Sequence, residues 1–157
     1  MRRVWRLVRK SHLKDAFSGE GARLAGGRWN HRDIAVVYTS ETLALTVLES
    51  FVHLTTKDVK FSLFSILVEI PDSVAIKALS QKDLPSNWRE EPPPDSTKDI
   101  GTDWFKSDKT AVLKVPSVII PEEINYIINP AHRDFKHLKI GKPRPFFLDP
   151  RMWKTSR

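Results

Sequence analysis

Short apolar runs rich in β-branched residues outnumber the helical patterns in this sequence, and this imbalance decides the fold class. Strands are predicted from "RRVWRLV", "IAVVYTS", "FSLFSILVEIP" and "SVAIKAL", with one more that breaks at Pro116 and another at 117–120. Only residues 41–54 form a long amphipathic helix, so helices are too few to cover both faces of a parallel sheet. We therefore expect an α+β fold: a single domain over residues 1–157, with a mixed β-sheet core and flanking helices.

The predicted helix at 41–54 has one wide apolar arc. Thr39 or Ser40 is expected to cap its amino end, and Glu41 suits the positive end of the helix dipole. Glu49 lies at the border of the arc, where its carboxylate is expected to be partly desolvated. The other side carries Thr46, Glu49, Ser50 and His53. The arc is expected to pack on the core and consists of Leu43, Ala44, Leu45, Val47, Leu48, Phe51, Val52 and Leu54.

Residues 84–99 contain four prolines and no apolar period. We expect a long proline-rich loop here. Loops of this length inside a compact domain are usually functional or disordered. Contact with a partner, covering of a site, and disorder are therefore the alternatives.

Several classes of protein are excluded by composition. The absence of cysteine rules out disulfides and thiolate metal sites, and the five histidines show no H-x-x-x-H or H-E-x-x-H spacing, so no metal site is expected. The longest apolar stretch is too short to span a membrane, and residues 1–15 lack the apolar core of a signal peptide. We expect a cytoplasmic protein with no membrane partner.

The net charge of +7 is distributed unevenly along the chain. Residues 1–32 carry nine lysines and arginines against two acidic residues, residues 33–130 nine against fifteen, and residues 131–157 eight against two. Basic ends suit a phosphorylated small molecule, nucleic acid or an acidic protein segment, and they also suit a surface that only keeps the protein soluble. Composition does not choose among these.

Two adjacent glycines, Gly26 and Gly27, precede Arg28 and Trp29. The segment matches neither G-x-G-x-x-G nor G-x-x-x-x-G-K-[ST], so neither a Rossmann turn nor a Walker loop is indicated. Paired glycines let a backbone approach a ligand closely, and a guanidinium suits phosphate or carboxylate. In the alternative interpretation the glycines form a plain turn, Arg28 is a surface cation and Trp29 fills the core.

Three further residues are candidates for a site. Glu49 has a position from which a carboxylate stabilises a developing cation, although most helix glutamates are solvated. Tyr38 ends a strand, where its phenol either reaches a cleft or simply packs. Ser117 follows a proline, and no histidine–aspartate pair is evident to activate it, so a serine hydrolase is not indicated.

Four fragments in a fixed order resemble the RES domain family. They are "GGRWN" at 26–30, "VVYTSETLALTVLES" at 36–50, "GTDW" at 101–104 and "LKVPSVIIPEEINYIINPAH" at 113–132. The arginine, glutamate and serine that give the family its name correspond to Arg28, Glu49 and Ser117. Residues 31–33, "HRD", stand where family members often have a glycine-containing turn.

The resemblance implies the toxin of a RES–Xre toxin–antitoxin pair, with a fold similar to that of ADP-ribosyltransferases. Such a toxin degrades NAD at the nicotinamide–ribose bond by phosphorolysis or hydrolysis, so NAD is a substrate, inorganic phosphate is the co-substrate in the first case, and no cofactor is implied. Carried over from the family, Arg28 and Tyr38 would bind and orient NAD, and Glu49 would hold the nicotinamide ribose as the bond breaks. Ser117 and Asn30 would contact the substrate.

The resemblance also implies partners. An Xre antitoxin has a helix-turn-helix portion, so DNA would be bound only through the antitoxin, and the toxin itself is expected to form a homo-oligomer such as a dimer. Three other functions stay open: an ADP-ribosyltransferase that modifies a macromolecule, a basic RNA-binding or RNA-cleaving toxin, and a catalytically dead homologue. The RNA alternative lacks basic–aromatic interleaving and a pair of histidines for strand cleavage.

Overall fold

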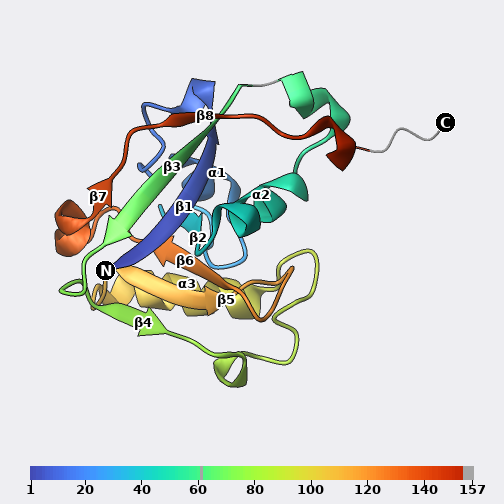
Figure 1. Ribbon diagram of the computed structural model, residues 1–157. Helices are drawn as coiled ribbons and strands as arrows, with labels where there is room; N and C mark the ends of the chain where they lie inside the picture. The colour runs from blue at the N-terminus through green and yellow to red at the C-terminus, as the bar shows by residue number, and fades with distance from the viewer. Residues whose placement is uncertain (61, 154–157) are drawn as a thin grey trace.

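A curled β-sheet organises the computed structural model, which describes residues 1–60 and 62–153 (Figure 1). The strands are β1 (Arg2–Arg9), β2 (Val37–Ser40), β3 (Leu63–Ile70), β4 (Ile76–Ala78), β5 (Val112–Pro116), β6 (Ile124–Ile128), β7 (Lys139–Ile140) and β8 (Arg144–Phe146). The α-helices are α1 (Glu20–Ala25), α2 (Leu43–Phe51) and α3 (Asp95–Ser107). Short 3-10 helices lie at Lys10–His12, Thr56–Lys60, Gln81–Asp83, Arg133–His137 and Pro150–Met152.

The sheet is mixed. Its strands follow the order β4–β5–β6–β2–β1–β3–β7, and β8 also pairs with β3. β4 and β5 run parallel, and the other pairs are antiparallel. The predicted α+β class with a mixed sheet and flanking helices is therefore confirmed.

One seam in the sheet is weakly paired. β1 pairs with β3 along its whole length, from Arg2 opposite Ile70 to Arg9 opposite Leu63. By contrast, β1 pairs with β2 only where Trp5 lies opposite Ser40. The two strands are not laddered beyond this pair, so side chains of both strands are free to line a space between them.

Both faces of the β2–β6–β5 part of the sheet are buried. Successive side chains of a strand point to opposite faces, so alternate residues of these strands belong to two different cores. One face packs against α3, which lies behind β5 and β6 in Figure 1. Its core consists of Trp29, Val36, Trp104, Leu113, Val115 and Ile127. The core on the other face includes Val4, Val37, Val68, Val112, Tyr126 and Ile128. The sheet curls so that β1 and β3 contribute to this second core.

The helix predicted at 41–54 is present as α2, but its cap differs from the prediction. The hydroxyl of Thr42 accepts a hydrogen bond of 3.0 Å from the amide of Leu45. Thr39 and Ser40, the expected caps, are the last two residues of β2. The cap prediction is wrong because α2 begins only at Leu43, so Glu41 and Thr42 separate it from β2 and Thr42 takes the cap position.

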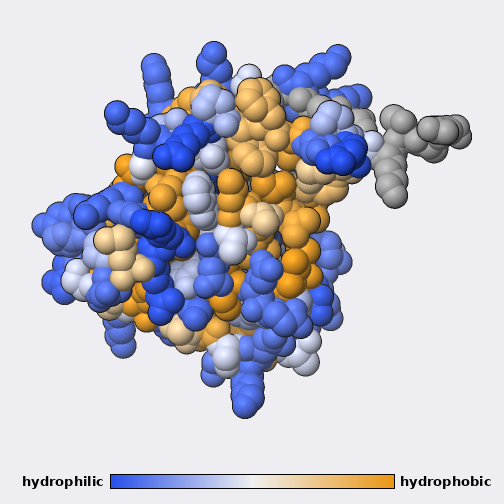
Figure 2. Space-filling view, viewed as in Figure 1, coloured by the Kyte–Doolittle hydropathy of each residue, from blue (hydrophilic) through white to orange (hydrophobic). Residues whose placement is uncertain are grey.

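The prediction that the apolar arc of this helix packs on the core holds for Leu45, which is 0% exposed, but not for the whole arc. Leu48 is 36% exposed and Val52 60% exposed, whereas Thr46 is only 5% exposed. The Thr46 hydroxyl contacts the carbonyls of Thr42 (2.9 Å) and Trp5 (3.3 Å) and so fastens α2 to the seam. The polar side of α2 therefore faces the protein, and apolar side chains gather across the middle of the face in Figure 2.

Other boundaries differ from the prediction in detail. The strand expected at 117–120 is absent, because Ser117 N bonds to Glu123 O and Glu123 N to Ile120 O, which turns the chain back into β6. The proline-rich loop expected at 84–99 ends at Pro94, since Asp95 begins α3. The strand expected from Phe61 is described from Leu63, and Phe61 itself lies outside the described residues.

Candidate active site

A cavity of about 930 Å³ opens at the seam between β1 and β2. Arg6 and Leu7 of β1 line one wall, and Tyr38 and Thr39 of β2 line another. The cavity is also lined by the polar side of α2, by residues 19–22 and 26–29, and by part of the proline-rich loop. Its volume lies within the range of small-molecule sites.

The carboxylate of Glu49 reaches this cavity from α2 and is held by two donors. Its Oε1 accepts hydrogen bonds from Ser117 Oγ (2.7 Å) and from Asn125 Nδ2 (2.6 Å). The Ser117 hydroxyl also accepts from the amides of Ile119 and Ile120, each at 3.1 Å. Because those amides occupy the lone pairs of the hydroxyl, its one proton is directed at Glu49.

Asn125 is a residue of this site that the sequence reasoning missed. It lines the cavity from β6, and its Oδ1 accepts a hydrogen bond of 2.7 Å from Ser40 Oγ. That bond fixes which end of the amide faces Glu49. Asn125 precedes Tyr126 in the distinctive "NYIINP" run, and this position was the one available signal.

Tyr38 joins the cavity wall to the segment 27–30. Its hydroxyl accepts from the amide of Trp29 (3.0 Å) and donates to Oδ1 of Asn30 (2.6 Å). Burial raises the pKa of the Tyr38 phenol, and the Trp29 amide and Arg28 offset this only in part. The phenol therefore stays protonated at neutral pH and keeps its donor.

Gly27 makes this contact geometrically feasible. A Cβ at Gly27 would lie 2.6 Å from the Tyr38 hydroxyl and 2.9 Å from Oδ1 of Asn30. Any side chain there would therefore displace the phenol. Gly27 thus makes a close approach within the protein. Trp29 is 2% exposed and belongs to the core, as the alternative interpretation of this segment expected.

Ser117 and Asn30 are both fully buried, at 0% exposure, behind the residues that line the cavity. The amide nitrogen of Asn30 contacts three backbone carbonyls, those of Ala22, His31 and Ile34. The geometry therefore favours positioning roles for both, Ser117 through Glu49 and Asn30 through Tyr38. A direct substrate contact for either stays a prediction.

Arg28 extends from the glycine pair to the proline-rich loop. Its Nη1 donates to the carbonyls of Trp88 (3.0 Å) and Glu90 (2.8 Å), and its Nη2 contacts Oε2 of Glu91 at 2.9 Å. Burial lowers the pKa of Arg28, and the neighbouring carboxylates of Glu91 and Glu49 offset this in part. A cation and the Glu49 carboxylate thus share one cavity.

Arg6 places a second cation in the cavity, which the sequence reasoning did not anticipate. Its Nε donates to the carbonyl of Ala16 (2.6 Å) and its Nη1 to the carbonyl of Tyr38 (3.0 Å). Burial lowers the pKa of Arg6 to about 10, and Asp15 offsets this in part, so the guanidinium is still charged at neutral pH. The lining of the cavity therefore contains two arginines together with four carboxylates, those of Glu49, Asp15, Glu20 and Glu91.

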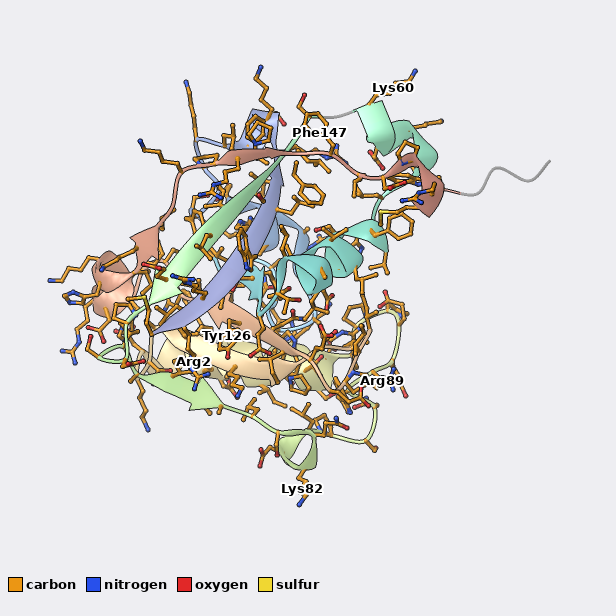
Figure 3. The ribbon with its side chains drawn as sticks, in the orientation of Figure 1. Arg2, Lys60, Lys82, Arg89, Tyr126 and Phe147 are labelled. Carbon is orange, nitrogen blue, oxygen red and sulfur yellow. The ribbon has the colours of Figure 1, made fainter. Side chains whose placement is uncertain are left out.

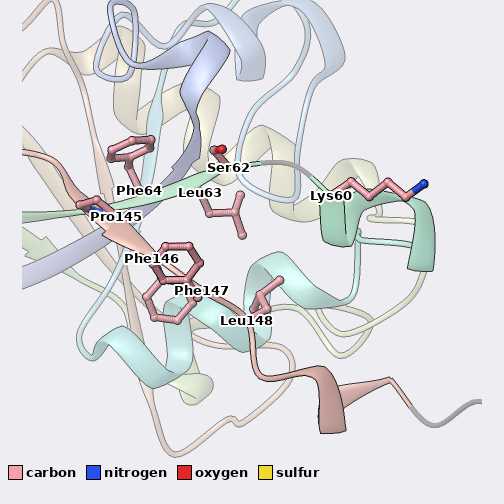
Figure 4. A pocket seen from close by; sticks show the side chains of 8 residues that line it. All are labelled: Lys60, Ser62, Leu63, Phe64, Pro145, Phe146, Phe147 and Leu148. Atoms are coloured by element: carbon pink, nitrogen blue, oxygen red, sulfur yellow. The ribbon is translucent and has the colours of Figure 1, made fainter.

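A second cavity, of about 250 Å³, lies between the start of β3 and the segment around β8 (Figure 4). Lys60 and Ser62 line it together with apolar side chains, and none of the residues that line it lines the larger cavity. Within 1–60 and 62–153, no group of three or more histidine, aspartate or glutamate residues is arranged to hold a metal ion. No helix in the described part of the chain is long and apolar enough to cross a membrane.

Comparison with known proteins places the chain among relatives of similar length. The RES domain family model matches residues 3–149. A protein named "Prs ADP-ribosylating toxin" from Sphingobium sp. (strain YBL2) is 40% identical over 156 residues, which is 97% of each chain. A "Toxin Res" from Yersinia enterocolitica is 40% identical over 152 residues, covering 95% of this chain and 98% of the relative.

A solved structure supports the fold independently. A chain of the M. tuberculosis MbcT–MbcA toxin–antitoxin complex superimposes with a TM-score of 0.75, covering 93% of this chain and 84% of that one. The two sequences are 17% identical. At that identity the likeness concerns the fold alone.

Proposed function

Because this chain belongs to the RES domain family, we propose that it is the toxin of a toxin–antitoxin pair and that it cleaves the bond between nicotinamide and ribose in NAD. One observation carries the proposal: the Glu49 carboxylate, fixed by Ser117 and Asn125, faces a cavity that also contains two arginines. This arrangement suits a substrate that develops positive charge at one end and carries phosphates at the other.

Glu49 would act on the electrostatics of the bond-breaking step. Nicotinamide in NAD is already a cationic leaving group, so it needs no proton, and positive charge spreads onto the ribose as it departs. A carboxylate that is already oriented stabilises that charge without reorganising. Losing one such contact typically costs about 3 kcal/mol in the barrier, or roughly 10² to 10³ in rate.

Arg28 and Arg6 would bind the anionic part of the dinucleotide. They come from different walls of the cavity, and a guanidinium group carries its positive charge throughout the neutral range. Two guanidinium groups match a pyrophosphate, whose oxygens accept paired N–H donors. Tyr38 lies between them, because its carbonyl binds Arg6 and its hydroxyl binds the segment that carries Arg28.

The acceptor of the ADP-ribosyl group distinguishes three versions of this function. Water gives hydrolysis, inorganic phosphate gives phosphorolysis, and a macromolecule gives ADP-ribosylation. The Sphingobium relative named as an ADP-ribosylating toxin favours keeping the third as a second candidate. An RNA-directed toxin has no comparable support from the cavity and would require steeply salt-dependent binding to arbitrary RNA.

The decisive experiment follows NAD and its products chromatographically, with and without inorganic phosphate, and uses the Glu49→Gln variant as the control. ADP-ribose-1″-phosphate formed only with phosphate identifies a phosphorylase, and ADP-ribose in both samples identifies a hydrolase. Label from NAD that remains on added protein identifies a transferase. NAD that survives all three conditions with the free, folded protein contradicts the proposal.

We extend the proposal to the partner: an antitoxin of the Xre type, with DNA contacted only through it, bound by a cytoplasmic toxin that forms a dimer. The basic ends of the chain suit an acidic surface on that antitoxin. Association steered by these charges slows as salt is raised. Complex formation at a salt-independent rate would contradict the electrostatic part of this proposal.

A further inference from the structure

Arg28 and Glu91 form an ion pair in the lining of the larger cavity. We propose that Glu91 is an internal competitor: its carboxylate occupies a donor of Arg28 that a phosphate of the substrate takes over on binding. Glu91 would thereby determine the affinity for NAD and the preference for substrates that carry a pyrophosphate. This inference rests on the proposed function for its substrate, but its geometry stands independently.

The three contacts of Arg28 with the proline-rich loop differ in kind. Nη1 is committed to two backbone carbonyls, those of Trp88 and Glu90. Nη2 binds a side chain, the carboxylate of Glu91, at 2.9 Å. Backbone carbonyls move only if the loop moves, whereas a carboxylate leaves by rotation of its own side chain. Nη2 is therefore the donor that a ligand can take without unfolding the loop.

The proline-rich loop is anchored to the protein at residues 87–88, a few residues before Glu91. Trp88 is 8% exposed, and Asn87 Oδ1 accepts a hydrogen bond of 2.8 Å from Ser96 Oγ at the start of α3. The side chain of Glu91, by contrast, is 74% exposed, and that of its partner Arg28 is 12% exposed. The anchored part holds Arg28 in place, and the exposed carboxylate is the replaceable partner. The guanidinium of Arg89, which is labelled in Figure 3, lies over the ring of Trp88 at 5.9 Å from its centroid.

Glu91 also lies where a ligand would meet it. Both Glu91 and Pro93 line the cavity that contains Glu49. An ion pair with one exposed partner contributes little to stability, because water screens it and its side chain loses entropy. A phosphate offers more acceptor oxygens and more charge to the same guanidinium than a carboxylate does. Exchange of Glu91 for phosphate is thus favourable for a pyrophosphate compound, and a substrate without phosphate has nothing to displace Glu91.

Steady-state kinetics of Glu91→Gln test the proposal. Glutamine keeps the size and an acceptor oxygen but removes the charge, so we expect KM for NAD to fall about fivefold with kcat within about twofold of wild type, the pattern of a change in uniform binding. Glu90→Gln is the matched control, because Glu90 uses only its carbonyl on Arg28. It removes the same charge one residue away and should leave KM unchanged.

Two results would overturn the inference. If Glu91→Gln lowers kcat without lowering KM, Glu91 supports the loop rather than competing with substrate. If Glu90→Gln lowers KM as much as Glu91→Gln does, the effect is one of general charge and not of the Arg28 contact.

Calorimetric binding of ADP separates this inference from the proposed function, because ADP carries the pyrophosphate and needs no turnover. We expect Glu91→Gln to bind ADP about fivefold more tightly than wild type and Glu90→Gln to match wild type. Tighter ADP binding in a protein that leaves NAD intact would remove the proposed reaction and keep this inference. Equal ADP affinity in all three proteins would remove this inference even if NAD is cleaved.

Discussion

Nδ2 of Asn125 lies 2.6 Å from Oε1 of Glu49, the same carboxylate oxygen that accepts the hydrogen bond from Ser117. Within the described part of the chain, no hydrogen bond reaches the other oxygen, Oε2. One oxygen of Glu49 is therefore held by the protein, while the other is available to a ligand in the cavity. This asymmetry is what a carboxylate needs if it is to meet a developing cation in a fixed geometry.

The first prediction concerns the charge of Glu49. In Glu49→Gln the amide oxygen still accepts from Ser117 and Asn125, so we expect the fold and melting temperature to be retained. The negative charge is lost, and we expect kcat for NAD cleavage to fall about 10² to 10³-fold. Steady-state NAD cleavage beside thermal melting checks this, with Glu41→Gln as the control because Glu41 is exposed. A folded Glu49→Gln protein with near wild-type turnover would contradict the role given to this carboxylate.

The second prediction concerns Asn125 as a positioning residue. Asn125→Ala removes one of the two donors that orient Glu49, and we expect kcat to fall about tenfold with little change in KM. In a Glu49→Gln background the same substitution should cost almost nothing further, because the charge it orients is already absent. A double-mutant cycle measures this. If the two losses simply add, Asn125 acts on the substrate directly rather than through Glu49.

The orientation of α2 shows what sequence periodicity can and cannot predict. The helix and its apolar arc were evident from residues 41–54, but the arc was assigned to the core because most helices bury their apolar side. Here the buried side includes Thr46, whose hydroxyl binds two carbonyls, and Glu49, whose carboxylate has two donors. The pattern of one helix carries no information about partners that are distant in the sequence, and here these come from β1, β6 and the turn after β5.

The individual contacts of the site could not be predicted from local sequence patterns either. Arg28, Tyr38 and Glu49 line one cavity, but Asn125 and Arg6 could not be selected from spacing alone. Each meets its partner only after the sheet has brought β1, β2 and β6 together. The "HRD" turn is a different case: Asp33 adopts a φ of 70°, a left-handed conformation. Aspartate is one of the few residues other than glycine that adopt this conformation readily.

The third prediction compares two glycines. A Cβ at Gly101 in α3 would lie 1.8 Å from the carbonyl oxygen of Trp29, so Gly101→Ala must push α3 away from the segment that carries Arg28. We expect it to lower the free energy of unfolding by about 3 kcal/mol or more. A Cβ at Gly21 in α1 would meet nothing within 4 Å, and Gly21→Ala should raise stability by about 0.5 to 1 kcal/mol. Urea unfolding of both variants measures the difference, and a Gly101→Ala protein as stable as Gly21→Ala would contradict the close packing of α3.

The fourth prediction concerns alkaline pH. The chain has two tyrosines, and burial raises the pKa of both Tyr38 and Tyr126 above the ordinary value of 10. At pH 10 we therefore expect less tyrosinate absorbance near 295 nm from the folded protein than from the protein in urea, where about half of the phenols should be ionised.

Linkage fixes the sign of the accompanying change in stability. Above pH 10 the unfolded chain loses phenolic protons that the folded chain retains, so the phenols make the free energy of unfolding fall as pH rises beyond 10, and they leave it unchanged below. Arg6 changes the free energy of unfolding in the opposite direction over this pH range, because burial lowers its pKa to about 10. Tyr38→Phe retains Arg6, so comparison of this variant with wild type isolates the contribution of the phenol. We expect wild type to lose more stability than Tyr38→Phe between pH 10 and 11, although the variant is less stable at pH 7 through its broken bonds to Trp29 and Asn30. Parallel stability curves for the two proteins above pH 10 would mean that Tyr38 ionises as freely in the folded state as in the unfolded chain, and that its hydroxyl does not hold the segment of Arg28 in place.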